Sequence, residues 1–251
     1  MSKNKPTHNR LYYDLAYLWP IFSPPEEYAH EADLWLQALR EKLGPGQHSI
    51  LDLGVGGGHL LSHLSSEFKA TAVDISERML ANSIRLNDNV EHILGDMRSI
   101  RLNRKFSAVL LHDSVSYLVS EDELKKTFET AAAHLETGGL LITVPDWFRE
   151  TFDGTFVEHR IIENEEGEFA FIEYVSDPDP SDSIIETIFF YILRNVDGIK
   201  VEEDRHITGI FSLETWERLM SESGFDVEVR PYPVYADDGE GYLLLGQVIS
   251  S

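Results

Sequence analysis

Short apolar runs alternate with amphipathic segments through the first 146 residues of the chain. Each run is only a few residues long and is rich in Val, Ile and Leu, as in strands that are buried on both faces. The segments between them carry apolar residues at helical spacing. The runs lie at 49–54, 69–75, 90–96, 106–112 and 138–145, and the helical segments lie at 23–46, 76–86 and 121–136. Strands that alternate with helices predict a parallel sheet with helices packed on its faces.

The pattern changes between residues 153 and 211, where apolar and polar positions alternate as in half-buried strands. Two stretches within this region, 163–169 and 194–200, have the composition of hairpin turns. The second contains Asp197 and Gly198, a pair that suits a tight two-residue turn. We therefore expect an antiparallel β insertion here.

Helical spacing returns at residues 212–225, with Ser212 in the position of an N-cap and Gly224 beyond the helix end. Two final apolar runs, 226–232 and 241–249, predict two more strands. The whole pattern predicts a Rossmann-like α/β fold. It has a seven-stranded, mostly parallel sheet and an antiparallel insertion, or lid, after the fifth strand. The expected boundaries are 1–147 with 212–251 for the α/β domain and 148–211 for the insertion.

Composition narrows the possible partners. The chain has 44 acidic against 21 basic residues and a formal net charge of −23, which opposes binding to nucleic acid or to an anionic membrane. It has no cysteine, so disulfides and thiolate chemistry are excluded. No apolar run approaches the roughly 20 residues of a membrane span, and residues 1–10 lack the apolar core of a signal peptide. We expect a cytoplasmic protein. His59, His63 and His159 show no ligand spacing, and no metal site is expected.

A glycine-rich loop follows the first predicted strand. Gly54, Gly56 and Gly58 read G-x-G-x-G, which differs from the G-x-G-x-x-G of dinucleotide sites and argues against a nicotinamide cofactor. Asp74 and Asp96 end the next two predicted strands. Carboxylates at these strand ends, beside a glycine loop, predict a pocket for a nucleoside that carries no diphosphate.

These segments, taken in order, resemble those of class I S-adenosylmethionine-dependent methyltransferases. The resemblance rests on "LDLGVGGG", "AVDISERML", "LGDMRSI", "FSAVLLHDSVSYL" and "LETGGLLITVPD". It implies that the glycine loop passes under the methionine part of the cofactor, with Asp52 nearby, and that Asp74 holds the ribose. The remaining implied cofactor contacts are Ile75 and Met79 at the adenine, Asp96 and Met97 at its amino edge, and His112 opposite the loop.

A narrower resemblance links the chain to sugar N,N-dimethyltransferases, which act on nucleotide-linked aminosugars. It is carried by residues 12–17, 145–152 and 204–225. In that group the insertion often serves dimerisation, so a homodimer through the insertion is implied here. The chain departs from the group at Tyr117, where the group has a histidine that can serve as a base. A second departure is an acidic loop, in which Asp237, Asp238 and Glu240 stand where the group tends to have a basic residue. That loop favours an amine or a neutral acceptor over a diphosphate.

The residues expected near the acceptor each have a structural alternative. Tyr117 can hydrogen-bond an amine, although a phenol with a pKa near 10 is a poor base, and it can equally pack under the insertion. His206 shares a strand face with Glu202 and Asp204 and is either catalytic or structural. The other residues with two readings are Tyr13 (over the cofactor, or a helix staple), Met79 (adenine wall, or core), and Trp147 and Phe148 (acceptor wall, or core).

We expect direct in-line transfer of a methyl group from S-adenosylmethionine to a small acceptor, in a site closed by the insertion. Nitrogen is the preferred acceptor atom and a hydroxyl oxygen is the alternative. A protein of a different class, which binds S-adenosylmethionine without catalysis, is the other reading. A pocket lined only by apolar groups around the methyl position would favour that reading.

Overall fold

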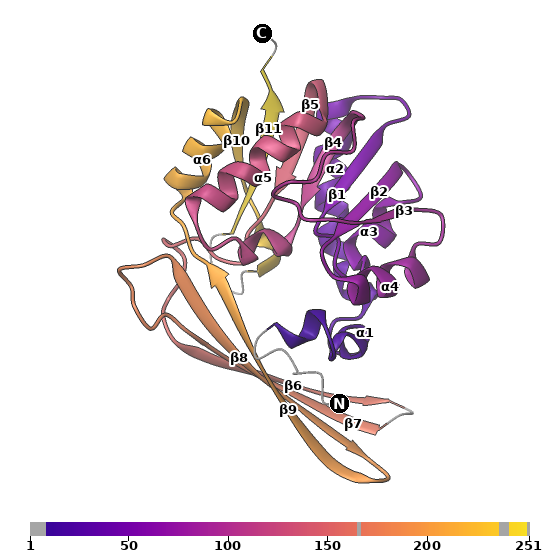
Figure 1. Cartoon of the computed structure of the whole chain (residues 1–251), viewed down its shortest axis with the longest axis vertical. Helices are drawn as coiled ribbons and strands as arrows, with labels where there is room; N and C mark the ends of the chain where they lie inside the picture. The colour runs from indigo at the N-terminus through magenta and orange to yellow at the C-terminus, as the bar shows by residue number, and fades with distance from the viewer. Residues whose placement is uncertain (1–8, 165–166, 236–240, 250–251) are drawn as a thin grey trace.

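Two sheets build the molecule, one inside an α/β domain and one beneath it (Figure 1). The structure is a computed structural model and describes residues 9–164, 167–235 and 241–249. The larger sheet has seven strands in the order β10-β11-β5-β4-β1-β2-β3. All neighbouring pairs in it are parallel except those that β11 makes with β5 and β10. Its strands are β1 (Ser49–Leu53), β2 (Lys69–Asp74), β3 (Glu91–Leu94), β4 (Phe106–Leu111), β5 (Leu135–Thr143), β10 (Phe225–Pro231) and β11 (Tyr242–Val248).

Within the residues that the structure describes, six α-helices accompany the sheet. They are α1 (Trp19–Phe22), α2 (Ala29–Leu43), α3 (His59–Leu64), α4 (Glu77–Leu86), α5 (Glu121–His134) and α6 (Leu213–Glu222). Serine side chains cap three of them by accepting a hydrogen bond from a backbone N–H in the first turn: Ser76 at α4, Ser120 at α5 and Ser212 at α6. Such caps satisfy backbone donors that have no partner inside the helix.

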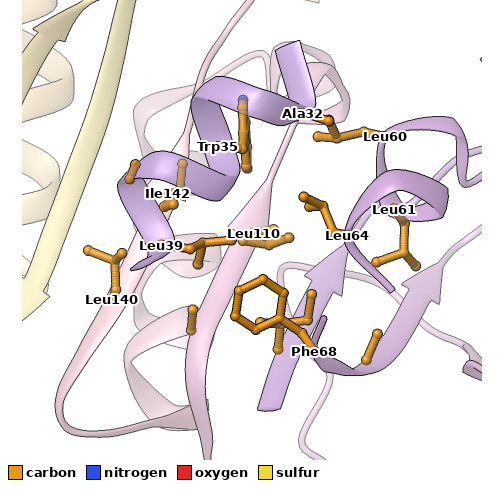
Figure 2. Packing of buried hydrophobic residues seen from close by; sticks show 14 of the residues in the cluster. Ala32, Trp35, Leu39, Leu60, Leu61, Leu64, Phe68, Leu110, Leu140 and Ile142 are labelled. Carbon is orange, nitrogen blue, oxygen red and sulfur yellow. The ribbon is translucent and has the colours of Figure 1, made fainter. Parts of the chain in front are cut away.

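One face of the sheet packs against α2 and α3 (Figure 2). Trp35 and Leu39 of α2 and Leu64 of α3 are buried against Leu110 and Ile142, which project from neighbouring strands. Alternate strand residues face the other way, since side chains along a strand point to opposite sides. On that second face lie Phe128 of α5 and Trp216 and Met220 of α6. Helices therefore cover both faces, which explains why the strands read as continuous apolar runs.

The chain order reverses between β1 and β4, which lie side by side although the chain passes through β2 and β3 between them. The segments that follow these two strands, after Leu53 and after Leu111, therefore diverge at the same edge of the sheet. Open α/β sheets bind their ligands in the crevice at such a point.

The second sheet is antiparallel, with strands in the order β6-β7-β8-β9. Its strands are β6 (Phe156–Asn164), β7 (Gly167–Ser176), β8 (Ile184–Asn195) and β9 (Gly198–Gly209). The N-terminal segment lies between this sheet and the α/β domain (Figure 1). Leu11 and Leu15 of that segment are buried with Met79 of α4 and with Tyr191 and Leu193 of the insertion. This small core joins the two sheets.

The predicted architecture is confirmed: a seven-stranded, mostly parallel sheet with an antiparallel sheet after its fifth strand. The helix expected over 23–46 is shorter, because residues Pro25–Tyr28 form a 3-10 turn and the α-helix begins only at Ala29. Pro24 and Pro25 have no N–H to donate, which confines them to the start of the turn. No helix in the described part of the chain is long and apolar enough to cross a membrane.

The glycine loop after β1 offers a test of this packing, because Gly56 and Gly58 both have positive φ (56° and 76°) but differ in their surroundings. A Cβ on Gly56 meets nothing within 4 Å, whereas one on Gly58 would lie 2.2 Å from Ser83 Oγ and 2.9 Å from Ser83 Cβ on α4. We expect Gly56→Ala to cost about 1 kcal/mol, the strain of a left-handed alanine. Gly58→Ala should cost at least about 2 kcal/mol more, because α4 must move. Urea unfolding of the two variants measures the difference, and equal midpoints would contradict this account of the loop.

Candidate active site

The glycine loop is held to the sheet by the carboxylate of Asp74. Asp74 ends β2 and accepts hydrogen bonds from the backbone N–H of Gly56 (2.8 Å to Oδ2) and of Ser76 (2.7 Å to Oδ1). Burial raises the pKa of Asp74, while the backbone N–H groups act in the opposite direction. A carboxylate has about four acceptor positions, so these two bonds leave others available for ligand hydroxyls.

The loop is also enclosed from three sides. A Cβ at Gly54 would lie 2.2 Å from Ser114 Oγ and 2.7 Å from Met97 Cε, and a Cβ at Gly57 would lie 2.4 Å from the ring of Trp19. Only glycine allows such close approach. Trp19 in turn stacks on His59, with ring centroids 5.8 Å apart. The N-terminal segment therefore covers the loop.

A small pocket of about 40 Å³ lies under this cover. It is lined by Trp19, Tyr28, Asp52, Gly54, Val55, Gly57, His59, Leu60 and His112. Three buried polar atoms around it, Trp19 Nε1, Asp52 Oδ1 and His59 Nδ1, have no hydrogen-bond partner among the described residues. Buried polar atoms are costly when unpaired. A ligand end that carries both an ammonium and a carboxylate would satisfy the Asp52 acceptor and the Trp19 donor together, which is the chemistry of a methionine end.

A buried polar chain supports the back of this pocket. His112 Nε2 lies 2.7 Å from Glu31 Oε1, the hydroxyl of Tyr232 donates to the same carboxylate, and Trp35 Nε1 donates to that hydroxyl (2.8 Å). Burial disfavours a charged His112, but the carboxylates of Asp113 and Glu31 outweigh it and raise the pKa of His112 to about 10. Burial likewise raises the pKa of Asp52 to about 7.

Glu31, His112 and Asp113 are also close enough to one another to hold a metal ion. Despite burial, the carboxylates of Asp113 and Glu31 raise the pKa of His112 to about 10, so the imidazole is protonated at neutral pH. The charge on His112 instead balances the two carboxylates.

A large pocket of about 420 Å³ opens beside the small one, and Trp19 lines both. Its walls come from the N-terminal segment, from the chain that follows β4 and β5, and from the inner face of the insertion sheet. The lining residues are Leu11, Tyr12, Trp19, Phe22, Ser23, Asp113, Tyr117, Asp146, Trp147, Phe156, Glu158, Phe171, Glu173, Thr187, Phe189, Tyr191, His206 and Thr208. Aromatic walls with a few polar groups are typical of small-molecule sites.

A hydrogen-bonded chain forms part of this wall. The Tyr117 oxygen lies 2.5 Å from His206 Nδ1, and His206 Nε2 lies 2.7 Å from Asp204 Oδ2. Because the carboxylate can only accept, Nε2 carries the proton and Nδ1 accepts from Tyr117. The ring of Tyr12 packs edge-on against that of Tyr117, with ring centroids 5.1 Å apart. Burial raises the pKa of Tyr117 above its usual value.

Carboxylates surround the rest of the large pocket. Asp113 and Asp146 follow β4 and β5, and Glu158 and Glu173 project from β6 and β7. Burial raises the pKa of Asp146, with a further contribution from Asp113. Burial, together with the neighbouring Glu158, raises the pKa of Glu173 to about 7. The pocket therefore attracts positive charge.

The structure brings many of the residues singled out from the sequence to these two pockets. Asp52, Gly54 and His112 line the small pocket, with Gly56 and Gly58 in the adjoining loop. Tyr117, His206 and Trp147 line the large pocket. Their roles in binding and catalysis stay predictions.

Two residues singled out from the sequence border neither pocket: Tyr13, expected over the cofactor, and Phe148, expected as an acceptor wall. Tyr13 is 52 % exposed and borders neither pocket, because the 3-10 turn Arg10–Tyr12 directs the preceding Tyr12 inward instead. Phe148 is 2 % exposed and its ring contacts Trp216 and Tyr242 in the core. Phe148 therefore packs in the core, which is the structural alternative given for it above.

The residues expected around the adenine lie at the strand ends beyond the glycine loop. Ile75 is 63 % exposed beside the end of β2, and Met79 is fully buried in the core between the sheets. Asp96 pairs with Arg98 at 2.7 Å, which lowers the pKa of Asp96, and Met97 packs toward Gly54. These four contacts with adenine stay predictions. The acidic loop with Asp237, Asp238 and Glu240 lies outside the described residues.

Several pocket residues have no signal in the sequence pattern alone. Tyr12, Trp19 and Tyr191 belong to aromatic positions that serve cores equally well, and only their contacts place them at the pockets. Glu158 and Glu173 did carry a signal, because they are acidic residues at inward positions of alternating strands. Acids at such positions deserve a functional explanation.

The chain is similar to known methyltransferases. A family model described as a methyltransferase domain matches residues 50–139. The dTDP-3-amino-3,4,6-trideoxy-alpha-D-glucopyranose N,N-dimethyltransferase of Streptomyces venezuelae is 33 % identical over 219 residues, which cover 86 % of this chain and 89 % of the relative. The dTDP-3-amino-3,6-dideoxy-alpha-D-glucopyranose N,N-dimethyltransferase of Streptomyces fradiae is 31 % identical over 199 residues, or 78 % of this chain and 77 % of the relative.

Solved structures of methyltransferases also resemble this chain. The crystal structure of Streptomyces venezuelae DesVI superposes with a TM-score of 0.84 at 27 % identity and covers 94 % of this chain and 99 % of that one. The agreement spans the sheet, the glycine loop and the insertion, and the unpaired polar atoms of the small pocket suit the methionine end of the methyl donor. The chain therefore belongs to the S-adenosylmethionine-dependent methyltransferases, in the family of the sugar N,N-dimethyltransferases.

Proposed function

We propose that this enzyme N-methylates a primary or secondary amine of a sugar-sized acceptor that binds in the large pocket. The observation that carries this proposal is the Tyr117–His206–Asp204 chain, which lines a pocket that adjoins the small one at Trp19. The curated relatives named above methylate amino groups of sugars, which supports the same acceptor class. Asp146, which lines the pocket and lies close enough to Tyr117 to raise the pKa of that hydroxyl further than burial does, favours an amine over a hydroxyl acceptor, because a carboxylate stabilises the ammonium form that binds first.

The bound S-adenosylmethionine supplies an electrophilic methyl group on a sulfonium, so the protein has to align a nucleophile and exclude water. Trp19, with the rest of the N-terminal segment, covers the glycine loop, and the insertion sheet closes the large pocket from the other side. An ammonium is no nucleophile, because its lone pair is occupied. The Tyr117–His206–Asp204 chain must therefore remove one proton from the ammonium before the methyl group is transferred.

The hydrogen-bonded chain can accept that proton. Tyr117 alone is a poor base, but its hydroxyl proton points at His206 Nδ1, so Tyr117 can take a proton from the amine as it gives its own to His206. The resulting imidazolium is stabilised by Asp204, whose carboxylate lies 2.7 Å from Nε2. Burial alone would raise the pKa of Asp204, but the hydrogen bond with His206 helps to lower it, so Asp204 stays ionised. These polar groups are what a protein that only holds the cofactor would lack.

Two finer proposals concern the setting of the enzyme. The outward face of the insertion sheet exposes Val157, Ile161, Ile199 and Val201, each at least 58 % exposed. Apolar side chains gathered on one sheet face are typical of an interface, and we propose a homodimer through it. We also propose a cytoplasmic location, which the absence of cysteine supports.

Substitution at the proton acceptor should affect turnover and leave cofactor binding intact. We expect Tyr117→Phe and His206→Gln each to lower kcat by about 100-fold or more, because the amine then loses its route for the proton. The dissociation constant of S-adenosylmethionine, measured by calorimetry, should change less than about twofold. Tyr174→Phe is the matched control, since Tyr174 is 38 % exposed and borders neither pocket. Equal losses in kcat and in cofactor affinity would refute the assignment.

The pKa of Asp52 makes cofactor affinity pH-dependent. Asp52 has a pKa of about 7 in the free protein, and only its ionised form can pair with the ammonium of the cofactor. Affinity should therefore rise as the pH rises from 6 to 8. Asp52→Asn should weaken binding about tenfold and flatten this rise, since one charge-assisted hydrogen bond is lost. Calorimetry at several pH values tests this, with Asp33→Asn on the exposed side of α2 as the control.

The proposed dimer is tested on the outward face of the insertion. Replacing Val157 and Ile161 together by glutamate should convert a dimer into a monomer, because buried charges without partners oppose association. Light scattering after size-exclusion chromatography reports the mass. Val196→Glu is the control, since Val196 is fully exposed at the β8–β9 turn. A wild-type protein that is already monomeric at micromolar concentration would overturn this proposal.

A further inference from the structure

Two glutamates face each other across the insertion sheet and toward the large pocket. Glu158 of β6 and Glu173 of β7 are direct partners in the antiparallel register, and both line the pocket. Neither carboxylate has a hydrogen-bond or ion-pair partner in the described part of the chain. Like charges directly opposite one another on a sheet are destabilising, so this pair costs stability in the free protein.

The same hairpin carries a second opposed pair that differs in one respect. Glu163 and Glu168 are also register partners, and their exposure matches that of Glu158 and Glu173, but Glu168 lies 3.6 Å from Arg194. The arginine relieves the charge there. The inward pair, by contrast, faces a pocket in which no lysine or arginine lines the wall among the described residues.

Basic residues near the pocket already have partners. The described insertion holds five of them: Arg160, Arg194, Arg205 and Lys200 pair with carboxylates, and Arg149 donates to backbone carbonyls. In the N-terminal segment, Arg10 pairs with Asp14 and Glu202. The described residues around the pocket therefore include no lysine or arginine that is without a partner and could bind a diphosphate.

The register also sets the distance between the glutamate pair and β9, the strand that carries His206. Glu158, Glu173, Phe189 and Asp204 form one row across the four strands, and His206 lies two residues along β9 from that row. With a strand spacing of about 4.8 Å, the backbone of Glu173 lies roughly 10 Å from that of β9. Another unpaired polar group belongs to the intervening strand: the hydroxyl of Tyr191 on β8, two residues from Phe189, is buried, lines the pocket and has no partner among the described residues. The space between the glutamate pair and His206 therefore suits a polar ring.

From these observations we infer that the acceptor is a free diamine of sugar size, one amino group at Tyr117 and the other held as an ammonium between Glu158 and Glu173, with no nucleoside diphosphate attached. This inference rests on the proposed N-methyl transfer and narrows its substrate class. The amine at Tyr117 loses a proton to the Tyr117–His206 pair. Its nitrogen then forms a new N–C bond to the methyl group as the S–C bond of the cofactor breaks, and the electrons of the S–C bond remain on sulfur. The second amine takes no part in the reaction and stays charged.

The inference separates this enzyme from the relatives described above, whose names give dTDP-linked monoaminosugars as their substrates. The decisive assay compares three acceptors under the same conditions. They are a methyl glycoside with amino groups on opposite sides of a six-membered ring, the same glycoside with one amine replaced by hydroxyl, and the dTDP ester of that monoamino sugar. We expect kcat/KM for the diamine to exceed that of the monoamine by at least about tenfold, as for one charge-assisted contact.

Variants tie that preference to the glutamates. Glu158→Gln and Glu173→Gln should each remove most of the preference for the diamine by raising its KM, while kcat/KM for the monoamine changes less than about twofold. Glu163→Gln, on the outward face of the same strand, should leave both acceptors unchanged. If the two glutamine variants gained as much affinity for the monoamine as they lost for the diamine, the glutamates would only set the overall charge of the pocket. That result would overturn the inference.

The remaining outcomes are distinguishable. Preference for the dTDP ester, or equal use of the diamine and the monoamine, overturns the diamine inference and leaves N-methyl transfer standing. Transfer to none of the three, with S-adenosylmethionine bound in calorimetry, overturns both proposals.

A stability measurement checks the same pair without any acceptor. Because the pKa of Glu173 is raised to about 7 in the folded protein, its ionisation lowers stability as the pH rises from about 4.5 through 7. Glu173→Gln should therefore raise the melting temperature at pH 8 by about 2 °C and change it little at pH 5. Adding the diamine should raise the melting temperature of the wild type more than that of this variant. A diamine that shifts both proteins equally would overturn the inference.

Discussion

The carboxylate of Asp204 holds together the parts from which the large pocket is made. Its Oδ1 accepts from the backbone N–H of Arg10, and its Oδ2 accepts from the N–H of Leu11 and lies 2.7 Å from Nε2 of His206. Two charge-assisted bonds to the backbone thus fix the N-terminal segment on β9, and the third contact fixes the tautomer of His206. Tyr12 and Trp19, which form the covers of the two pockets, take their positions from this attachment. The two pockets are therefore held together by one buried charge.

Electrostatics divides the site into two regions with different tasks. Behind the small pocket, the charged His112 lies between Glu31 and Asp113, which compensates the charges locally and keeps that wall in place. In the large pocket no lysine or arginine lines the wall beside Glu158 and Glu173 among the described residues, so the charge of these two glutamates is available to a ligand. A buried carboxylate without a partner is costly, so such an arrangement persists where a ligand repays it. The overall charge of −23 has the same sign and would draw cationic ligands toward the molecule.

Under the proposed mechanism, two residues that lie far apart in the chain supply the base together. The resemblance to the sugar N,N-dimethyltransferases implies a histidine at the position of Tyr117, and a tyrosine alone would be a weak base. Here an imidazole approaches the same place from β9, on the insertion sheet, and accepts from the tyrosine at 2.5 Å. Tyr117 and His206 are 89 residues apart in the chain, so only the closure of the insertion over the α/β domain makes them one unit.

Local physics determined most of the framework from the sequence. Apolar runs of strand length, serine caps, and glycines followed by strand-end acids are each dictated over a few residues, and for that reason they predicted the sheet, the insertion and the cofactor loop. Tyr117 and His206 could be singled out one by one as residues at a strand end and on a strand face. The sequence could not show that they touch, that Tyr12 rather than Tyr13 turns inward, or that Phe148 fills the core. Those outcomes depend on register across four strands and on how the N-terminal segment docks, which are contacts between residues far apart in the chain, so only the tertiary structure decides them.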